Sequence, residues 1–153
     1  MEFKSLDEIL KFAIQREKEA VDFYSKLAKK AVRQSIKEVF EGFVEEEKKH
    51  VALFQDFSAN KEKIDSYEFK DVTDLKISDY IMDIEYNDNM AMPEILKMAM
   101  KREEKAVNLY TALISKTDNE QAQKAFRFIA QEEKKHKLIL ETMYDDYLST
   151  QDN

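Results

Sequence analysis

The sequence predicts an all-α protein, a four-helix bundle made of two repeated helical hairpins. The first observation is that 153 residues include one Gly and one Pro, whereas β-sandwiches, barrels and nucleotide-binding α/β folds need many turn or phosphate-binding glycines. The second is that residues 8–57 align without gaps with residues 94–143, with 18 identities in 50 positions. The third is that apolar residues recur at alternating steps of three and four in four segments, as on one face of a helix.

Four helices are expected, at residues 5–30, 34–58, 93–116 and 119–147. The sequences Ser5-Leu6-Asp7-Glu8 and Thr117-Asp118-Asn119-Glu120 fit the capping-box pattern of a helix start. Pro93 suits the first turn of the third helix, where its missing N–H leaves no hydrogen bond unmade. Repeat one (about 5–58) and repeat two (about 93–147) are joined by a crossover at about 59–92, and residues 1–153 are expected to form a single domain.

The composition excludes several classes of function. Because the chain has no Cys, it contains no disulfides, zinc fingers or cysteine-ligated iron–sulfur and rubredoxin-type centres. The net charge of −7 argues against a nucleic-acid partner, which would need a basic surface. The N-terminal segment has no apolar signal region, and no window approaches a membrane-spanning length of apolar residues. We therefore expect a cytoplasmic protein without a membrane or nucleic-acid partner.

In each of the four segments, the recurring apolar residues form a stripe along one face of the helix, which we call the seam. A Glu interrupts all four seams near their middles, and a His also interrupts two of them. The six residues are Glu17, Glu47, His50, Glu103, Glu133 and His136. Ionised carboxylates in an apolar interior are strongly unfavourable unless a positive charge compensates them, and two divalent ions would compensate four. Glu-x-x-His also places both side chains on one helical face. The six residues are therefore predicted to bind two metal ions, for which carboxylates with few imidazoles favour iron or manganese. The alternative, a solvated charged face, fits the repeated seam position less well.

Two tyrosines follow the seam glutamates by two helical turns. Tyr24 and Tyr110 are either core aromatics whose hydroxyls find some buried partner, or residues that act on the metal site. For the second case we favour a hydrogen bond to a ligand carboxylate over an electron relay. Glu46 and Glu132 fall off the seam and are expected around the ligands or at the surface.

Two repeated motifs make the chain similar to a known family over nearly its whole length. With RE-x2-A-x3-Y from Arg16 and Arg102, and EKKH at 47–50 and 133–136, the chain resembles the rubrerythrin branch of the ferritin-like superfamily. The resemblance implies a ferritin-like bundle with a di-iron centre on the six residues above, and rubrerythrins reduce hydrogen peroxide. Unlike rubrerythrins proper, the chain has Ala106 in place of a further Glu and lacks the cysteine-ligated rubredoxin domain. Its symmetrical ligand set is more similar to bacterioferritin-type centres.

The leading functional hypothesis is a di-iron oxidoreductase that reduces hydrogen peroxide or O2. Its electrons would come from an external donor, such as a rubredoxin-like protein or a flavin reductase, and manganese or zinc could replace the iron. Two alternatives stay open: a ferroxidase or iron-storage protein with the same ligands, and a helical scaffold without redox activity. A homodimer is expected, in which two hairpins joined by a long crossover could exchange halves.

Overall fold

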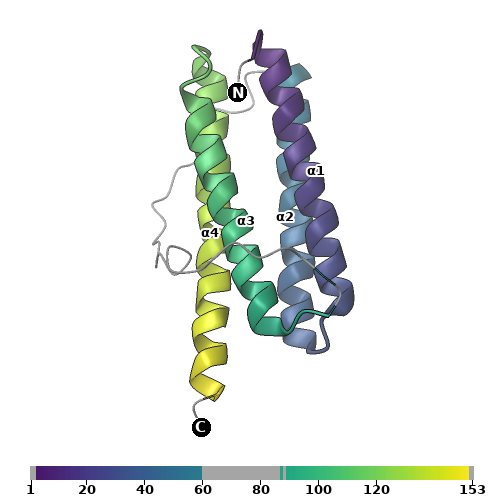
Figure 1. Ribbon diagram of the computed structural model, residues 1–153. Helices are drawn as coiled ribbons and strands as arrows, with labels where there is room; N and C mark the ends of the chain where they lie inside the picture. The colour runs from purple at the N-terminus through teal and green to yellow at the C-terminus, as the bar shows by residue number, and fades with distance from the viewer. Residues whose placement is uncertain (1–2, 60–86, 88, 152–153) are drawn as a thin grey trace. The chain divides into compact units, whose positions relative to one another are not determined.

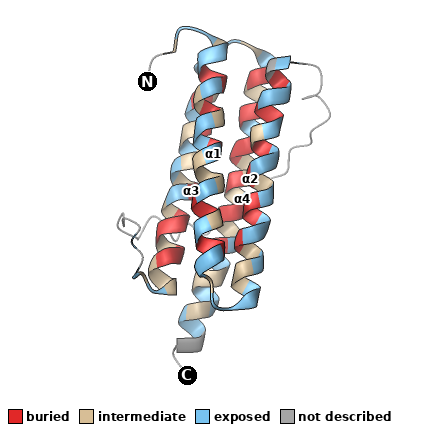
Figure 2. Ribbon diagram, turned by 90° about the vertical axis from the view of Figure 1, so that its right-hand side faces the viewer, coloured by how far each residue is buried: buried red, intermediate tan, exposed pale blue. Residues whose placement is uncertain are grey.

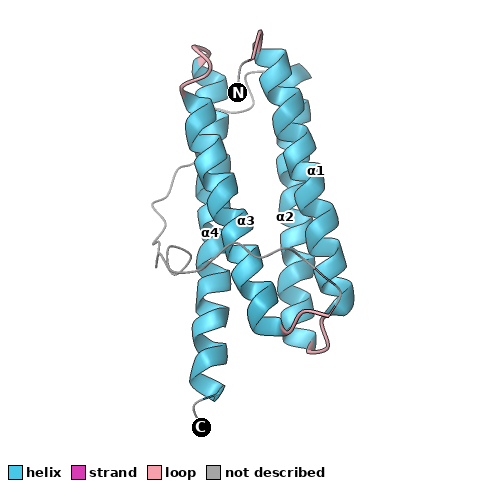
Figure 3. Ribbon diagram, viewed as in Figure 1, coloured by secondary structure: helices cyan, strands magenta, loops and turns pink. Residues whose placement is uncertain are grey.

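The computed structural model describes residues 3–59, 87 and 89–151, and the described part of the chain is helical without any strand (Figures 1 and 3). The helices are α1 (Leu6–Lys30), α2 (Gln34–Ala59), α3 (Met92–Ile114) and α4 (Glu120–Gln151). Their order and type confirm the all-α prediction. The largest difference in length is at the end of α4, which continues four residues beyond the predicted 147 to Gln151. The predicted crossover at 59–92 lies mostly outside the described residues.

The start of α1 follows the predicted cap with one change. Ser5 is the N-cap, and its hydroxyl oxygen accepts a hydrogen bond from the Glu8 backbone N–H at 3.2 Å. The Glu8 carboxylate accepts from the backbone N–H of Lys4 at 2.6 Å, where the capping box predicts Ser5 as the donor. The hydrogen bond to the Ser5 side chain therefore forms as predicted, whereas the Glu8 side chain binds the backbone N–H one residue before the predicted one.

The predicted capping box at Thr117 is wrong, because α4 begins with a different cap. The side-chain oxygen of Asn119 accepts a hydrogen bond from the Ala122 N–H at 2.9 Å, which makes Asn119 the capping residue. Thr117 instead accepts from the Asn119 N–H at 3.1 Å and so forms a turn before the helix. Asn is among the strongest N-cap residues, and here it lies directly before the first helical residue. Pro93 lies in the first turn of α3 as predicted.

The chain divides into two compact units. The first comprises residues 1–67 and 116–125, and the second comprises residues 68–115 and 126–153. The first unit therefore holds α1, α2 and the first residues of α4, while the second holds α3 and the rest of α4. Among the described residues, no helix combines the length and the apolar character that a membrane span requires.

In the first unit α1 and α2 pack against each other through the predicted seams. The buried apolar residues of these seams are Leu10, Ala13, Tyr24, Leu27, Phe40, Phe43, Phe54 and Phe57. Figure 2 shows the buried positions of the helices in red. The large aromatic rings of α2 fill this core, and truncating a buried Phe to Ala typically costs about 3–5 kcal/mol. The seam is less buried in the first turn of each helix, where Leu6 and Ile36 are half-buried.

In the second unit the seams of α3 and α4 are buried in the same pattern. Their buried apolar residues are Leu96, Ala99, Tyr110, Leu113, Phe126, Ile129 and Leu140. The end residues Met92 and Met143 are half-buried. Each unit thus has an apolar core that is interrupted by the acidic and imidazole side chains described next.

Candidate metal centre

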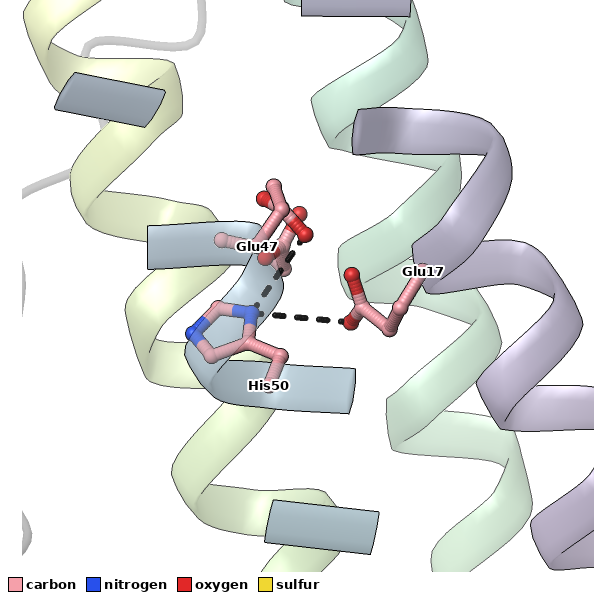
Figure 4. Close-up of side chains that lie close together, drawn as sticks. Glu17, Glu47 and His50 are labelled. Carbon is pink, nitrogen blue, oxygen red and sulfur yellow. Dashed lines mark ion pairs between the residues drawn. The ribbon is translucent and has the colours of Figure 1, made fainter. Parts of the chain in front are cut away.

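In the first unit, α1 and α2 bring Glu17, Glu47 and His50 together as the first triad (Figure 4). Glu17 projects from the middle of α1, and Glu47 and His50 lie one turn apart on α2. The Nδ1 atom of His50 lies 3.4 Å from Glu47 Oε2 and 3.6 Å from Glu17 Oε1. The exposed fraction is 0% for Glu47 and 2% for the other two residues. Three polar side chains therefore converge inside an apolar core.

In the second unit, α3 and α4 form an equivalent second triad of Glu103, Glu133 and His136. The Nδ1 atom of His136 lies 3.6 Å from Glu103 Oε1, the same separation as that between His50 and Glu17 in the first triad. All three residues are buried, with exposed fractions of 2 to 4%. Within each triad, one potential ligand atom per residue lies within 4.8 Å of the others. The sequence repeat is thus also a repeat of local geometry.

The acid–base properties of the first triad show the effect of burying two carboxylates together. Burial is the largest cause that raises the pKa of Glu47 well above 4.5, and the charge of Glu17 raises it further. His50 acts in the opposite direction, but the pKa remains raised. Without a cation the Glu47 carboxyl therefore keeps its proton to a higher pH than an ordinary glutamate does. A bound cation would take the place of that proton and favour the ionised form.

The donor atoms of each triad fit a metal ion. Separations of 3.4 to 3.6 Å between Nδ1 and the carboxylate oxygens are longer than a good N–H···O hydrogen bond. Two ligand atoms that are each about 2.1 Å from one ion, at angles of about 90 to 110°, lie about 3.0 to 3.5 Å apart. In each triad, the two negative charges of the carboxylates also match the two positive charges of one divalent ion. Oxygen donors with one imidazole suit iron or manganese better than metals that seek thiolates.

Comparison with sequence models of known protein families finds a match. A sequence model of the rubrerythrin family matches residues 8–91 and 94–152, which include all six residues of the two triads. The chain belongs to the rubrerythrin family. No protein of curated function and no solved structure matches it. Membership of the rubrerythrin family confirms the resemblance found in the two motifs, and with it the ferritin-like four-helix bundle as the fold class. Because the 153 residues of the sequence include no Cys, they cannot ligate a rubredoxin-type iron site.

The two tyrosines singled out in the sequence occupy equivalent places in this rubrerythrin-family chain. Tyr24 and Tyr110 each have an exposed fraction of 1%. Tyr24 stacks on Phe40 with ring centroids 6.1 Å apart, and Tyr110 stacks on Phe126 at 6.3 Å. Their burial and aromatic packing fit the core interpretation, and the hydrogen bond to a ligand carboxylate stays a prediction.

The off-seam glutamates Glu46 and Glu132, which were expected around the ligands or at the surface, are both half-buried. Glu132 forms an ion pair with Lys135, whose Nζ lies 2.7 Å from Glu132 Oε2. Ala106, at the position where rubrerythrins proper carry a further Glu, is half-buried and offers no ligand atom. Each triad therefore keeps the composition of two carboxylates and one imidazole.

Sequence reasoning missed two buried charged residues of the second unit. Lys137 and Glu141 on α4 have exposed fractions of 4% and 0%. They follow Glu133 by four and eight residues and lie beside the apolar seam, not on it. The signal that could have found them is a difference between the repeats, because the equivalent residues of repeat one are Val51 and Gln55.

Proposed function

We propose that the chain holds two iron ions, one on each triad, and that the pair reduces hydrogen peroxide or O2 with electrons from an external donor. The observation that carries the proposal is the presence of two buried triads with the same composition and closely similar geometry. Membership of the rubrerythrin family supports iron as the metal. When bound, two ferrous ions supply one electron each, which together with two protons convert one hydrogen peroxide into two waters.

The residues of the triads have distinct roles in this proposal. Glu17 and Glu47 compensate the charge of one ion, Glu103 and Glu133 that of the other, and His50 and His136 complete the two ligand sets. Burial of all six side chains keeps bulk water away and strengthens their electrostatic interaction with the ions. Tyr24 and Tyr110 are proposed to hold a ligand carboxylate in place through their hydroxyl groups.

The external donor follows from the chemistry of the chain. Because the sequence contains no Cys, these residues cannot ligate an iron–sulfur or rubredoxin-type centre that would pass electrons onward. We therefore propose that the ferric pair is reduced by a separate protein, of the rubredoxin-like or flavin-reductase kind. The choice between peroxide and O2 as the oxidant is also part of the proposal.

Stopped-flow oxidation of the di-ferrous protein tests the proposed reaction. Protein loaded without oxygen with two ferrous ions per chain is mixed with hydrogen peroxide or with O2, and ferric absorption is followed. We expect oxidation to be faster than for ferrous iron in the same buffer, and Glu47→Ala and Glu133→Ala to slow it. Glu45→Ala is the matched control, because its side chain is 69% exposed on the same helix as Glu47.

Two outcomes would contradict the proposed reaction. If iron binds but neither oxidant reacts faster than with ferrous iron in buffer, the chain is not an oxidoreductase of this kind. If O2 oxidises many ferrous ions per chain and the protein assembles into a large cage, the function is iron storage.

A further inference from the structure

The turn that joins α1 to α2 concentrates positive charge at one end of the first unit's hairpin (Figure 1). Residues 23–37 contain five basic residues and no acidic one, although the whole chain has a net charge of −7. At a rise of 1.5 Å per residue, all five lie within about 6 Å of the turn along the helix axes. We call this region the basic turn; its charged residues are Lys26, Lys29, Lys30 and Arg33, which are exposed, and Lys37, which is half-buried.

An apolar side chain lies at the tip of the basic turn. Val32 has an exposed fraction of 97%, whereas the next most exposed large apolar residue of the described chain, Leu148, reaches 43%. A single exposed apolar residue is common on protein surfaces. Here, however, the exposed valine lies in the middle of the five basic residues, so the tip combines an apolar centre with a positively charged border.

The stability of the helices does not explain the basic turn. Lys29 and Lys30 suit the last turn of α1, because the helix dipole favours cations there. Arg33 and Lys37 stand at the start of α2, where the dipole favours anions, and the first turn of α2 has no acidic residue. Two of the five charges are therefore at positions that helix stability disfavours.

The internal repeat shows that a similar hairpin forms without these charges. Residues 109–123, which are equivalent to residues 23–37, contain one basic and two acidic residues. The last turn of α3 has no basic residue, and Asp118 stands at the place of Val32. Both the charge and the apolar tip thus belong to repeat one alone, which points to a role outside folding.

We propose that the basic turn binds the surface of an anionic phospholipid bilayer, with its basic side chains at the lipid phosphates and Val32 inserted among the headgroups. Clusters of four to eight basic residues are typical of such binding. We expected no membrane partner because no segment of the sequence has the length and apolar character of a span, but binding to a membrane surface needs no span. The role is independent of the proposed iron chemistry.

The composition of the basic turn favours a lipid surface over a protein or a nucleic acid. Four of its five charged residues are Lys, which is depleted at protein interfaces, whereas Arg is enriched there. A nucleic acid would attract the same charges, but its phosphate backbone offers no apolar surroundings for Val32. An anionic bilayer offers both diffuse negative charge and an apolar boundary below the headgroups.

Salt screening allows an acidic chain to bind a negative surface at this one end. At about 0.15 M ionic strength, charges more than about 8 Å from a surface are largely screened. The nearest acid on α2 is Glu38, whose carboxylate accepts a hydrogen bond from Gln34 Nε2 at 3.2 Å, and the nearest on α1 is Asp22. Basic residues therefore outnumber acidic ones near the turn, and the other acids along the two helices lie farther from the surface.

Sedimentation with vesicles of phosphatidylcholine, with and without phosphatidylglycerol, measures the binding. The wild-type protein should bind only the anionic vesicles, and less tightly at higher salt. Because one basic residue near the surface contributes about fivefold, Lys26→Gln/Lys29→Gln should weaken binding about 25-fold. Lys11→Gln/Lys48→Gln is the matched control with the same change of charge, since these lysines of α1 and α2 are 76% and 57% exposed and lie away from the turn.

Variants of Val32 test its insertion. Val32→Leu should tighten binding about threefold and Val32→Asn should weaken it about fivefold, whereas a purely electrostatic contact would leave both unchanged. Because the chain has no Trp, Val32→Trp adds a single indole whose fluorescence should shift to shorter wavelength with anionic vesicles. Asp118→Trp, at the equivalent exposed position of repeat two, should show no shift.

Three results would overturn the inference. The first is no binding to anionic vesicles, or equal binding to vesicles without phosphatidylglycerol. The second is equal weakening in Lys11→Gln/Lys48→Gln and Lys26→Gln/Lys29→Gln, which would remove the basic turn as the contact. The third is tighter binding to duplex DNA than to vesicles, with no effect of the Val32 variants, which would assign the basic turn to nucleic acid. Each of these results leaves the proposed metal site untouched.

Discussion

Replacing Glu47 by Gln is expected to stabilise the metal-free protein at neutral pH and to reduce the stabilisation that bound metal gives. Burial, and then the charge of Glu17, raise the pKa of Glu47 above its unfolded value of about 4.5. At pH values between the unfolded and the folded pKa, the folded chain therefore retains a proton that the unfolded chain has released. A carboxyl whose pKa is raised on folding makes its full contribution to the free energy of unfolding at pH values below its unfolded pKa. This contribution is lost as the pH rises through the folded pKa.

The magnitude follows from the geometry of the first triad. Potential ligand oxygens of Glu17 and Glu47 lie within 4.8 Å of each other. Two unit charges at that distance repel by about 3 kcal/mol at an effective dielectric constant of about 20. The folded chain can avoid this repulsion if Glu47 takes up a proton. At about pH 7, protonating a carboxyl whose unfolded pKa is about 4.5 costs about 3 kcal/mol, so the destabilisation by Glu47 cannot exceed about that value. Glu47→Gln should thus raise the free energy of unfolding by up to about 3 kcal/mol, or the Tm by roughly 10 °C.

Thermal unfolding of the metal-free protein at about pH 5 and about pH 7.5 measures this effect. The gain from Glu47→Gln should be large at the higher pH and shrink toward zero at the lower one. Added Fe2+ or Mn2+ should raise the Tm of the wild type more than that of the variant, in which the first triad lacks one carboxylate. Glu45→Gln, at an exposed position with Lys48 Nζ 3.5 Å from its carboxylate, should change the free energy of unfolding by less than about 0.5 kcal/mol. A Glu47→Gln variant less stable than wild type at both pH values would refute the reasoning.

Three further predictions concern other parts of the chain. Gly42→Ala should stabilise the protein by about 0.5 to 1 kcal/mol in urea unfolding, because Gly42 lies inside α2 and an added Cβ meets no atom within 4 Å; a loss of stability would argue against this. Asn119→Ala should cost about 1 kcal/mol and Thr117→Ala less, because Asn119 caps α4, and the reverse order would restore the predicted Thr117 cap. Tyr24→Phe and Tyr110→Phe should keep two iron ions per chain and slow ferrous oxidation in stopped-flow experiments, whereas unchanged rates would leave the tyrosines as core residues.

The parts of the site that could be predicted were those that break a regular pattern. Glu17 and Glu47 stand at seam positions where an apolar residue is expected, and the repeat reproduces both, so their burial followed from spacing alone. His50 lies on the same seam and follows Glu47 by three residues, which predicts that the two side chains are neighbours. The structure brings these residues together as expected.

The parts that could not be predicted depend on packing beside the seam. Lys137 and Glu141 directly follow the seam residues His136 and Leu140, and charged residues at such positions are ordinarily exposed. Their burial is a tertiary effect that helical periodicity does not contain. At the start of α4, Thr117 and Asn119 are two residues apart and both can cap a helix, so the pattern alone did not distinguish them.

The most direct test of the central claim is the iron content and Mössbauer spectrum of protein reconstituted with isotopically enriched ferrous iron and then oxidised. Two iron ions per chain are predicted, with the spectrum of a magnetically coupled pair. Glu47→Ala and Glu133→Ala should each lower the iron content, while Glu45→Ala should leave it unchanged. Wild-type protein with less than one iron per chain, the spectrum of two isolated ions, or unchanged iron content in both ligand variants would contradict a di-iron centre on the two triads.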